Sequence, residues 1–254
     1  MTRFPSLSEA LDVGRGDVVS FVGGGGKTSA ILTLVTELRA AGVHVLVTTT
    51  TKIGRRLADA LPVVWWATDP ADGALRRLSE SGAILLVAES TPDGKLAGPD
   101  PDALDALIDD LGQAVALIEA DGARSLPIKA PAAHEPVVPR RTGIVVPMVG
   151  LDALGRPIEA GSVHRPDLLV QFGEKGVVTP ELVVALLTSP VGGLKNVPPN
   201  AAVRPLLNKL DTAPEAVARK IAVDLLASAP PSVDRVVLAG VGCGAYRAVT
   251  RRSG

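Results

Sequence analysis

The sequence predicts an α/β protein with a mostly parallel β-sheet and helices on both faces of that sheet. Three observations lead to this prediction. Short runs rich in β-branched residues alternate along the chain with longer stretches of helical period. A glycine-rich segment stands between one such run and a helical stretch, and a pair of carboxylates directly follows another run. Polar side chains in those positions are typical of the ligand-binding edge of an open parallel sheet.

Eight segments are expected to form the strands, because each is a short apolar run bounded by turn-forming residues. They are residues 17–21, 43–48, 63–66, 84–87, 114–118, 144–149, 202–207 and 235–238.

The helices are predicted from apolar periodicity and from their starting residues. An apolar stripe at i, i+3, i+4 and i+7 predicts a helix that begins near Thr28 and is closed by Gly42. The stripe consists of Ile31, Leu34, Val35 and Leu38. Capping residues followed by proline at 69–70, 100–101 and 179–180 predict three further helix starts. A threonine with a glutamate three residues later, at 212–215, predicts a capping box.

The whole chain, residues 1–254, is expected to be a single nucleotide-binding α/β domain. Its 254 residues and 46% hydrophobic content allow one substantial core. Two segments depart from the alternation of strands and helices. Residues 127–141 contain four prolines and are expected to form an irregular ordered loop, and the Gly/Pro-rich residues 190–200 are expected to form a flap.

Composition argues against several classes of partner. The formal net charge is −1 and the aromatic content is 2%, so the basic surface and stacking platforms of nucleic-acid-binding proteins are not expected. No window approaches the run of about 18 apolar residues that a membrane span needs. A single cysteine, Cys243, allows no intrachain disulfide. We therefore expect a cytoplasmic protein, with no nucleic-acid or membrane partner.

The glycine-rich segment has the features of a phosphate-binding loop. An apolar strand leads into Gly23, Gly24, Gly25 and Gly26, which Lys27 and Thr28 follow at the start of the amphipathic helix. Backbone amides and the helix N-terminus would bind phosphate, the lysine would neutralise its charge, and the threonine hydroxyl would coordinate Mg²⁺. Phe21 stands where the full Walker A pattern has its first glycine, so the loop resembles the shorter form of Mur-type ligases. The alternative is a glycine-rich turn without a ligand.

Acidic and hydroxyl side chains are expected to complete this site. Glu119 and Asp121 follow a predicted strand and could both point at Mg²⁺ or at an attacking water. Together with Lys27 they are the candidate catalytic residues. Thr49 and Thr51, at the end of another strand, are further candidate Mg²⁺ ligands. Each of these side chains could instead be a cap or turn residue.

A second motif predicts the identity of the base. Asn208, Lys209 and Asp211 form an Asn-Lys-x-Asp arrangement that resembles the guanine-specificity motif of GTPases. The aspartate would accept hydrogen bonds from guanine, and adenine would leave it unpaired. The motif therefore favours GTP modestly over ATP, although an ordinary turn would explain the same four residues.

A family resemblance extends over nearly the whole chain. The long block at 119–139, together with segments 23–28, 48–52, 149–155, 163–166 and 208–211, resembles the YqeC family of selenium-dependent molybdenum hydroxylase accessory proteins. The resemblance implies a role in supplying or inserting the labile selenium cofactor of such enzymes. Within and near the block, five basic residues could bind an anionic substrate beside the phosphates: Arg124, Lys129, His134, His164 and Arg165.

These predictions lead to one hypothesis and two alternatives. The hypothesis is a P-loop nucleoside triphosphatase that uses Mg²⁺ and acts as a maturation factor, with a molybdenum hydroxylase or other maturation proteins as partners. One alternative is a Mur-ligase-like or kinase-like enzyme that activates a small acid or oxyanion. The other is a binding module that responds to nucleotide without hydrolysing it. The sequence leaves these three open.

Overall fold

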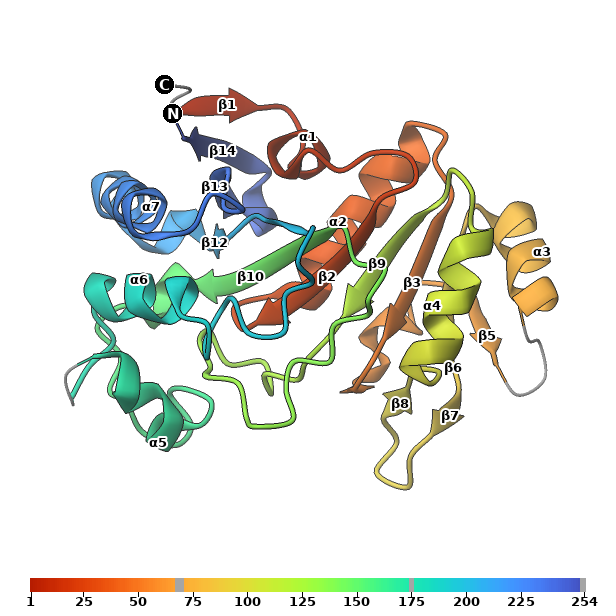
Figure 1. Ribbon diagram of the computed structural model, residues 1–254, viewed down its shortest axis with the longest axis horizontal. Helices are drawn as coiled ribbons and strands as arrows, with labels where there is room; N and C mark the ends of the chain where they lie inside the picture. Colours follow the sequence, from red (N-terminus) through yellow and green to blue (C-terminus); the bar gives the residue numbers. More distant parts are fainter. Residues whose placement is uncertain (67–70, 174–175, 252–254) are drawn as a thin grey trace.

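The computed structural model describes residues 1–66, 71–173 and 176–251. Within these ranges the chain forms an eleven-stranded sheet in the order β1-β14-β13-β12-β10-β2-β9-β3-β6-β5, with β11 beside β10 (Figure 1). All neighbouring strands are parallel except at one edge, where β14 runs antiparallel to both β13 and β1. The predicted α/β class with a mostly parallel sheet is confirmed.

The strands of the large sheet are β1 (Thr2–Phe4), β2 (Val18–Gly23), β3 (Val45–Thr49), β5 (Val63–Trp65), β6 (Ala83–Val87), β9 (Val115–Glu119), β10 (Ile144–Gly150), β11 (Ala202–Val203), β12 (Leu206–Asn208), β13 (Arg235–Gly240) and β14 (Ala245–Thr250). A separate small sheet consists of β4 (Lys52–Ile53), β8 (Leu96–Ala97) and β7 (Glu89–Ser90).

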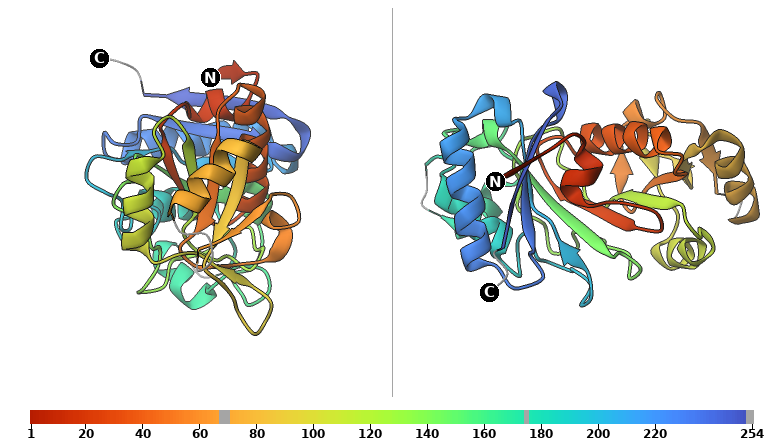
Figure 2. Two further views of the ribbon diagram at one scale, coloured as in Figure 1. Left: turned by 90° about the vertical axis from the view of Figure 1, so that its right-hand side faces the viewer. Right: turned by 90° about the horizontal axis from the view of Figure 1, so that it is seen from above.

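Helices cover both faces of the large sheet, as predicted (Figure 2). On one face, α1 (Leu7–Leu11) and α2 (Lys27–Ala40) pack on the centre of the sheet in a single apolar cluster. On the other face, α3 (Ala71–Ser81) and α4 (Pro101–Asp110) cover one end of the sheet. The opposite end of that face is covered by α6 (Pro180–Thr188) and α7 (Glu215–Ser228), with the short α5 (Pro166–Leu169) beside them.

The centre of this second face is covered by irregular chain instead of a helix. Val138 and Val197 pack there on a small cluster from β2, β10 and neighbouring loops. The predicted irregular loop at 127–141 has no helix or strand, and segment 190–200 is fastened to it by side-chain hydrogen bonds. Lys195 Nζ donates to the carbonyls of Ala132 and Ala133, and Asn196 Nδ2 donates to that of Pro136. Movement of segment 190–200 as a flap stays a prediction.

Each of the eight predicted strands is present, and one of them is divided. Residues 202–207 form β11 and β12, which are separated by Arg204 and Pro205. Proline has no N–H for the strand ladder, and the buried guanidinium of Arg204 turns away to the carbonyls of Leu11 and Asp12. The apolar run predicted the strand, but the break depends on contacts with a distant segment.

The predicted helix starts have mixed outcomes. Asp100 and Thr179 cap α4 and α6 through their side chains, and Gly42, with φ of +69°, closes α2 by donating its N–H to the Arg39 carbonyl. The capping box at 212–215 is wrong. Thr212 Oγ1 instead donates to the Lys209 carbonyl within a 3₁₀ turn, and α7 begins at Glu215 after Pro214. The start predicted at 69–70 lies outside the described residues.

The sequence prediction missed both outer strands next to the chain ends, β1 and β14, together with α1. In β14 the signal was present, because Tyr246 and Ala248 are buried with period two. None of the helices in the described part of the chain has the length and apolar character that crossing a bilayer requires.

Candidate functional site

The glycine-rich loop connects β2 to α2 at the carboxyl edge of the sheet, between the neighbouring strands β9 and β10. Backbone packing there requires glycine. Gly25 has φ of +86°, and a Cβ added to it would lie 2.0 Å from the amide nitrogen of Gly150, at the end of β10. Only a residue without a side chain allows the two backbones to approach this closely.

The amides of the loop fall into two groups. Those of Gly23, Gly24 and Gly25 donate to the Asp121 carboxylate and to the carbonyls of Met148 and Leu126. The N–H groups at the start of α2 have no helical carbonyl to bind, and Gly26 has no side chain to cap them. Three of the four glycine amides thus have partners within the protein, and phosphate binding by the loop stays a prediction. Gly26 and the first turn of α2 are the part of the loop that presents amides to a ligand.

Lys27 is buried against the loop. Its side chain is 3% exposed, and its ammonium lies 3.0 Å from Asp121 and 3.9 Å from Glu119 while donating to the Gly23 carbonyl. Burial acts to lower the pKa of Lys27, but the carboxylates of Asp121 and Glu119 outweigh it and raise that pKa above its ordinary value. Lys27 is therefore charged, and the carboxylates of Asp121 and Glu119 match its charge.

Thr28 and Glu119 form a pair of oxygen ligands at the start of α2. The Thr28 hydroxyl donates to Glu119 Oε2 over 3.2 Å, and burial raises the pKa of the Glu119 carboxyl despite the charge of Lys27. A hydroxyl and a carboxylate side by side match the hard oxygen ligands that Mg²⁺ takes, with phosphate and water completing its shell. Within the described ranges, no three His, Cys, Asp or Glu side chains gather into a metal cluster.

The other predicted metal ligands have backbone partners. Thr49 Oγ1 donates to the carbonyl of Glu119 over 2.7 Å, and accepts a hydrogen bond from the amide of Thr51. Asp121 accepts from Gly23 and pairs with Lys27. These contacts hold the loop and the end of β9 in place, which leaves Glu119 as the carboxylate closest to Thr28.

A buried charge chain runs from the glycine-rich loop through the 119–139 block to Arg165. It consists of Lys27, Asp121, Lys129, Glu135 and Arg165. Lys129, whose side chain is fully buried, lies 3.0 Å from Asp121 and 2.7 Å from Glu135. Arg165 binds both carboxylate oxygens of Glu135, at 2.5 and 3.1 Å. Burial acts to raise the pKa of Glu135, but hydrogen bonds from Arg165 and Lys129 hold it at about 2. Sequence reasoning had not identified Glu135.

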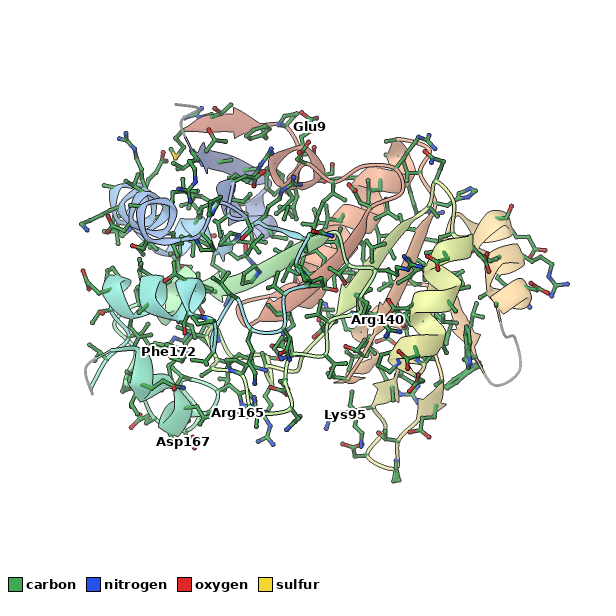
Figure 3. All side chains as sticks on the ribbon, in the orientation of Figure 1. Glu9, Lys95, Arg140, Arg165, Asp167 and Phe172 are labelled. Atoms are coloured by element: carbon green, nitrogen blue, oxygen red, sulfur yellow. The ribbon has the colours of Figure 1, made fainter. Side chains whose placement is uncertain are left out.

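A cavity of about 640 Å³ opens over this loop and is strongly basic. Seven cationic side chains line it: Lys27, Lys52, Arg56, Lys95, Arg124, Arg165 and Lys209. Glu119 and Glu135 are the carboxylates among its lining residues. Lys95, from the turn between β7 and β8, and Arg165, before α5, approach from opposite sides (Figure 3).

The structure brings Arg124, His164 and Arg165 to the cavity, whereas Lys129 is buried in the charge chain and His134 is exposed outside the lining. The sequence analysis did not identify Lys52, Arg56 or Lys95 as residues of this site. The basic cluster that follows the threonine run was the available signal for the first two.

His164 is neutral near physiological pH. Burial, followed by the charges of Arg165, Lys129 and Arg124, lowers its pKa to about 4. The side chain can therefore accept a hydrogen bond through one ring nitrogen and donate one through the other.

Unusual backbone conformations gather at the cavity. Six residues other than glycine in the described ranges have positive φ, and four of them line the cavity: Arg124, Ser125, Arg165 and Lys209. A positive φ is disfavoured for residues with a side chain, and such residues are concentrated at functional sites in proteins. Three of these four residues are cations, so the backbone is strained at the points where it positions charge in the cavity.

The Asn-Lys-x-Asp motif lies beside the loop. Asn208 Nδ2 donates to the Gly25 carbonyl over 2.8 Å, and its oxygen accepts from the amide of Val241. Lys209 pairs with Asp152 at 2.8 Å. Asp211 is exposed and lines a second hollow of about 780 Å³ between the motif and α2. The two hollows share lining residues Gly26, Ser29, Arg56 and Lys209, so they adjoin at the loop.

Comparison with known proteins identifies the family of this chain. The family model described as "YqeC protein" matches residues 19–167, more than half of the chain. The chain belongs to the YqeC family. A relative described as "Uncharacterized protein YqeC", from Escherichia coli (strain K12), is 35% identical over 218 residues, which cover 82% of this chain and 83% of the relative.

The residues that the YqeC model matches include the loop and every lining residue of the basic cavity except Lys209. The matched residues run from β2 through the whole charge chain and end at residue 167, inside α5. The Asn-Lys-x-Asp motif lies beyond the region that the YqeC model matches.

Proposed function

We propose that this protein binds a nucleoside triphosphate with Mg²⁺ and hydrolyses it, as a maturation factor for selenium-dependent molybdenum hydroxylases. The observation that carries the nucleotide assignment is the Thr28–Glu119 pair beside the uncapped start of α2, with Lys27 at the same point. Helix amides, an ammonium group and two adjacent oxygen ligands are the groups that a triphosphate with its metal requires.

The loop residues would act mainly by electrostatic stabilisation. Amides of Gly26 and the first turn of α2 would bind phosphate oxygens, and Lys27 would leave the Gly23 carbonyl to contact the terminal phosphates. Glu119, whose pKa is raised by burial, would orient the attacking water and accept a hydrogen bond from it. Asp121 would remain with Lys129 as a fixed support for the loop.

Mg²⁺ would be held by the Thr28 hydroxyl and the Glu119 carboxylate, directly or through water. Bound there, it would neutralise part of the charge that develops on the transferred phosphoryl group.

The second hollow supports a nucleoside position, because it adjoins the loop at Gly26 and is lined by Asn208, Lys209 and Asp211. Asn208 and Lys209 are bound to other parts of the protein, whereas Asp211 has no hydrogen-bond or ion-pair partner among the described residues. Asp211 is therefore free to accept hydrogen bonds from guanine. This arrangement supports GTP over ATP. The maturation role is the part of the proposal that the resemblance of the 119–139 block to the YqeC accessory proteins supports.

Titration calorimetry with GTP and ATP in the presence of Mg²⁺ tests the nucleotide assignment. We expect Lys27→Ala to weaken both nucleotides at least about tenfold, because a hydrogen bond to a charged group is lost. Asp211→Ala should weaken GTP by a similar factor and leave ATP unchanged. Lys220→Ala, which removes an exposed lysine of α7, is the matched control. Wild-type affinity in both site variants would contradict the assignment.

The maturation role has its own test. A selenium-dependent molybdenum hydroxylase is coexpressed with the wild-type chain or with Lys27→Ala, and the selenium content per molybdenum is measured in the purified enzyme. We expect the variant to lower that ratio without changing the molybdenum content. Equal selenium content would separate nucleotide binding from a maturation function.

A further inference from the structure

The cavity contains more positive charge than a bound nucleotide accounts for. Four of its cationic side chains already pair with carboxylates: Lys27, Lys95, Arg165 and Lys209. The three remaining cations, Lys52, Arg56 and Arg124, have no carboxylate partner among the described residues. A triphosphate has about four negative charges, of which bound Mg²⁺ cancels about two. Because Lys27 is already matched by carboxylates, the three unpaired cations are the ones to count, and they exceed the remaining two negative charges by about one.

The side chains of Lys52, Arg56 and Arg124 are exposed, but the backbone and one guanidinium of the cavity wall have a defined geometry. Arg124 and Ser125 occupy consecutive left-handed conformations, with φ of 50° and 60°, and Arg165 follows at 59°. Glu135 binds Arg165 through both oxygens and fixes the orientation of its guanidinium. We call Arg124, Ser125, His164 and Arg165 the basic wall. Its geometry is set by backbone strain and by a buried carboxylate, which is typical of a pre-formed site.

The basic wall combines the groups that bind a small oxyanion. Arg124 supplies unpaired charge, both guanidinium groups supply N–H donors, and the Ser125 hydroxyl can donate or accept. His164 is held neutral, so it can accept a hydrogen bond from a protonated anion oxygen without adding further charge.

We propose that the basic wall binds a second substrate, a small oxyanion, at the same time as the nucleotide occupies the glycine-rich loop. This inference rests on the proposed nucleotide site, because the wall and the loop line one cavity. Lys52 and Arg56, which follow β3, complete the positive rim on the other side. The protein would then bring an oxyanion and a nucleoside triphosphate together.

Inorganic phosphate is the probe for this site. The protein is first saturated with Mg²⁺ and the non-hydrolysable β,γ-imido analogue of GTP, which occupies the loop, and phosphate is then titrated by calorimetry. We expect one phosphate per chain. Arg124→Ala should weaken that phosphate at least about tenfold, because a charge-assisted hydrogen bond is lost, while the affinity for the analogue stays within about twofold. Arg76→Ala, which removes an exposed arginine of α3, is the matched control.

A second titration without nucleotide separates the two proposals. Here phosphate can reach both the loop and the wall, so Lys27→Ala and Arg124→Ala should each remove one of two binding events. If the analogue does not bind, the nucleotide proposal fails. The oxyanion site still stands in that case if Lys27→Ala binds one phosphate and this binding is lost when Arg124 is also replaced by alanine. If the loaded protein binds no phosphate, or binds it equally in Arg124→Ala, the oxyanion proposal is overturned. Thermal melts of each variant establish that it is folded.

Discussion

Two charged clusters lie at opposite edges of the parallel strands, and they differ in burial. At the carboxyl edge, the buried charge chain has Lys129 fully buried and Asp121 only 2% exposed. At the amino edge, Arg204 and Arg235 pair with Asp12 and Asp234, which are 61% and 45% exposed. Both clusters connect segments distant in sequence. Only the one at the loop removes its carboxylates from water.

The difference indicates what each cluster does. Taking a charge out of water costs several kcal/mol, so a buried ion pair is weak evidence for stability and needs another reason to be retained. The buried charge chain reaches Lys27 at one end and Arg165 at the other, and both line the cavity. The amino-edge cluster joins the end of α1 to the start of β13 through exposed pairs. We therefore assign the first cluster to the proposed site and the second to tethering of the N-terminal segment.

The largest effect is expected for Lys129→Ala. It leaves the carboxylates of Asp121 and Glu135 buried without their shared partner, which should lower the free energy of unfolding by about 3 to 5 kcal/mol. Urea denaturation at neutral pH measures this change. Lys220→Ala, at an exposed pair on α7, should cost less than about 1 kcal/mol in the same assay. Similar losses in the two variants would remove the contrast between buried and exposed charge.

The decrease in the free energy of unfolding at acid pH should depend on Glu135. Its pKa is about 2 in the folded protein against 4.5 for an ordinary glutamate. Because the folded-state value is depressed, its contribution is present above pH 4.5 and is lost as the pH falls toward 2. The shift corresponds to roughly 3 kcal/mol. Unfolding free energies of Glu135→Gln should therefore fall less steeply than those of wild type between these pH values. Parallel curves would show that Glu135 is not held by Arg165 and Lys129.

A smaller effect is expected for Arg204→Ala. Its guanidinium donates to the carbonyls of Leu11 and Asp12 at the end of α1, and these acceptors can be reached by water once the side chain is gone. We expect a loss of about 1 to 3 kcal/mol in the free energy of unfolding, with unchanged nucleotide affinity. Weakened nucleotide binding in this variant would mean that the two edges of the sheet are coupled.

Asp12→Ala should have the smallest effect. Its carboxylate is mostly exposed, and Arg204 and Arg235 both keep Asp234 as a partner without it, so we expect a change within about 1 kcal/mol. Raising the salt concentration should reduce the difference from wild type further, because exposed pairs are screened. A loss as large as that of Lys129→Ala would require a buried role for this carboxylate.

Much of the fold could be predicted because its signals are local. Apolar runs marked all eight predicted strands, and the stripe from Ile31 to Leu38 marked α2. The break at Pro205 and the true start of α7 were missed, because they depend on the distant carbonyls that bind Arg204 and on the 3₁₀ turn that takes up Thr212. Edge strand β1 is three residues long and has no periodicity to detect.

The sequence by itself determined the order of strands and helices, the glycine-rich loop and the residue types around it, since each follows from neighbours along the chain. Only the tertiary structure decided which of those groups meet. It assigned three glycine amides and Asp121 to the support of the loop, set Glu119 against Thr28, and joined Lys129 to Glu135 and Arg165. Spacing in a sequence cannot specify these pairings, because they depend on how distant loops fold over the same sheet edge.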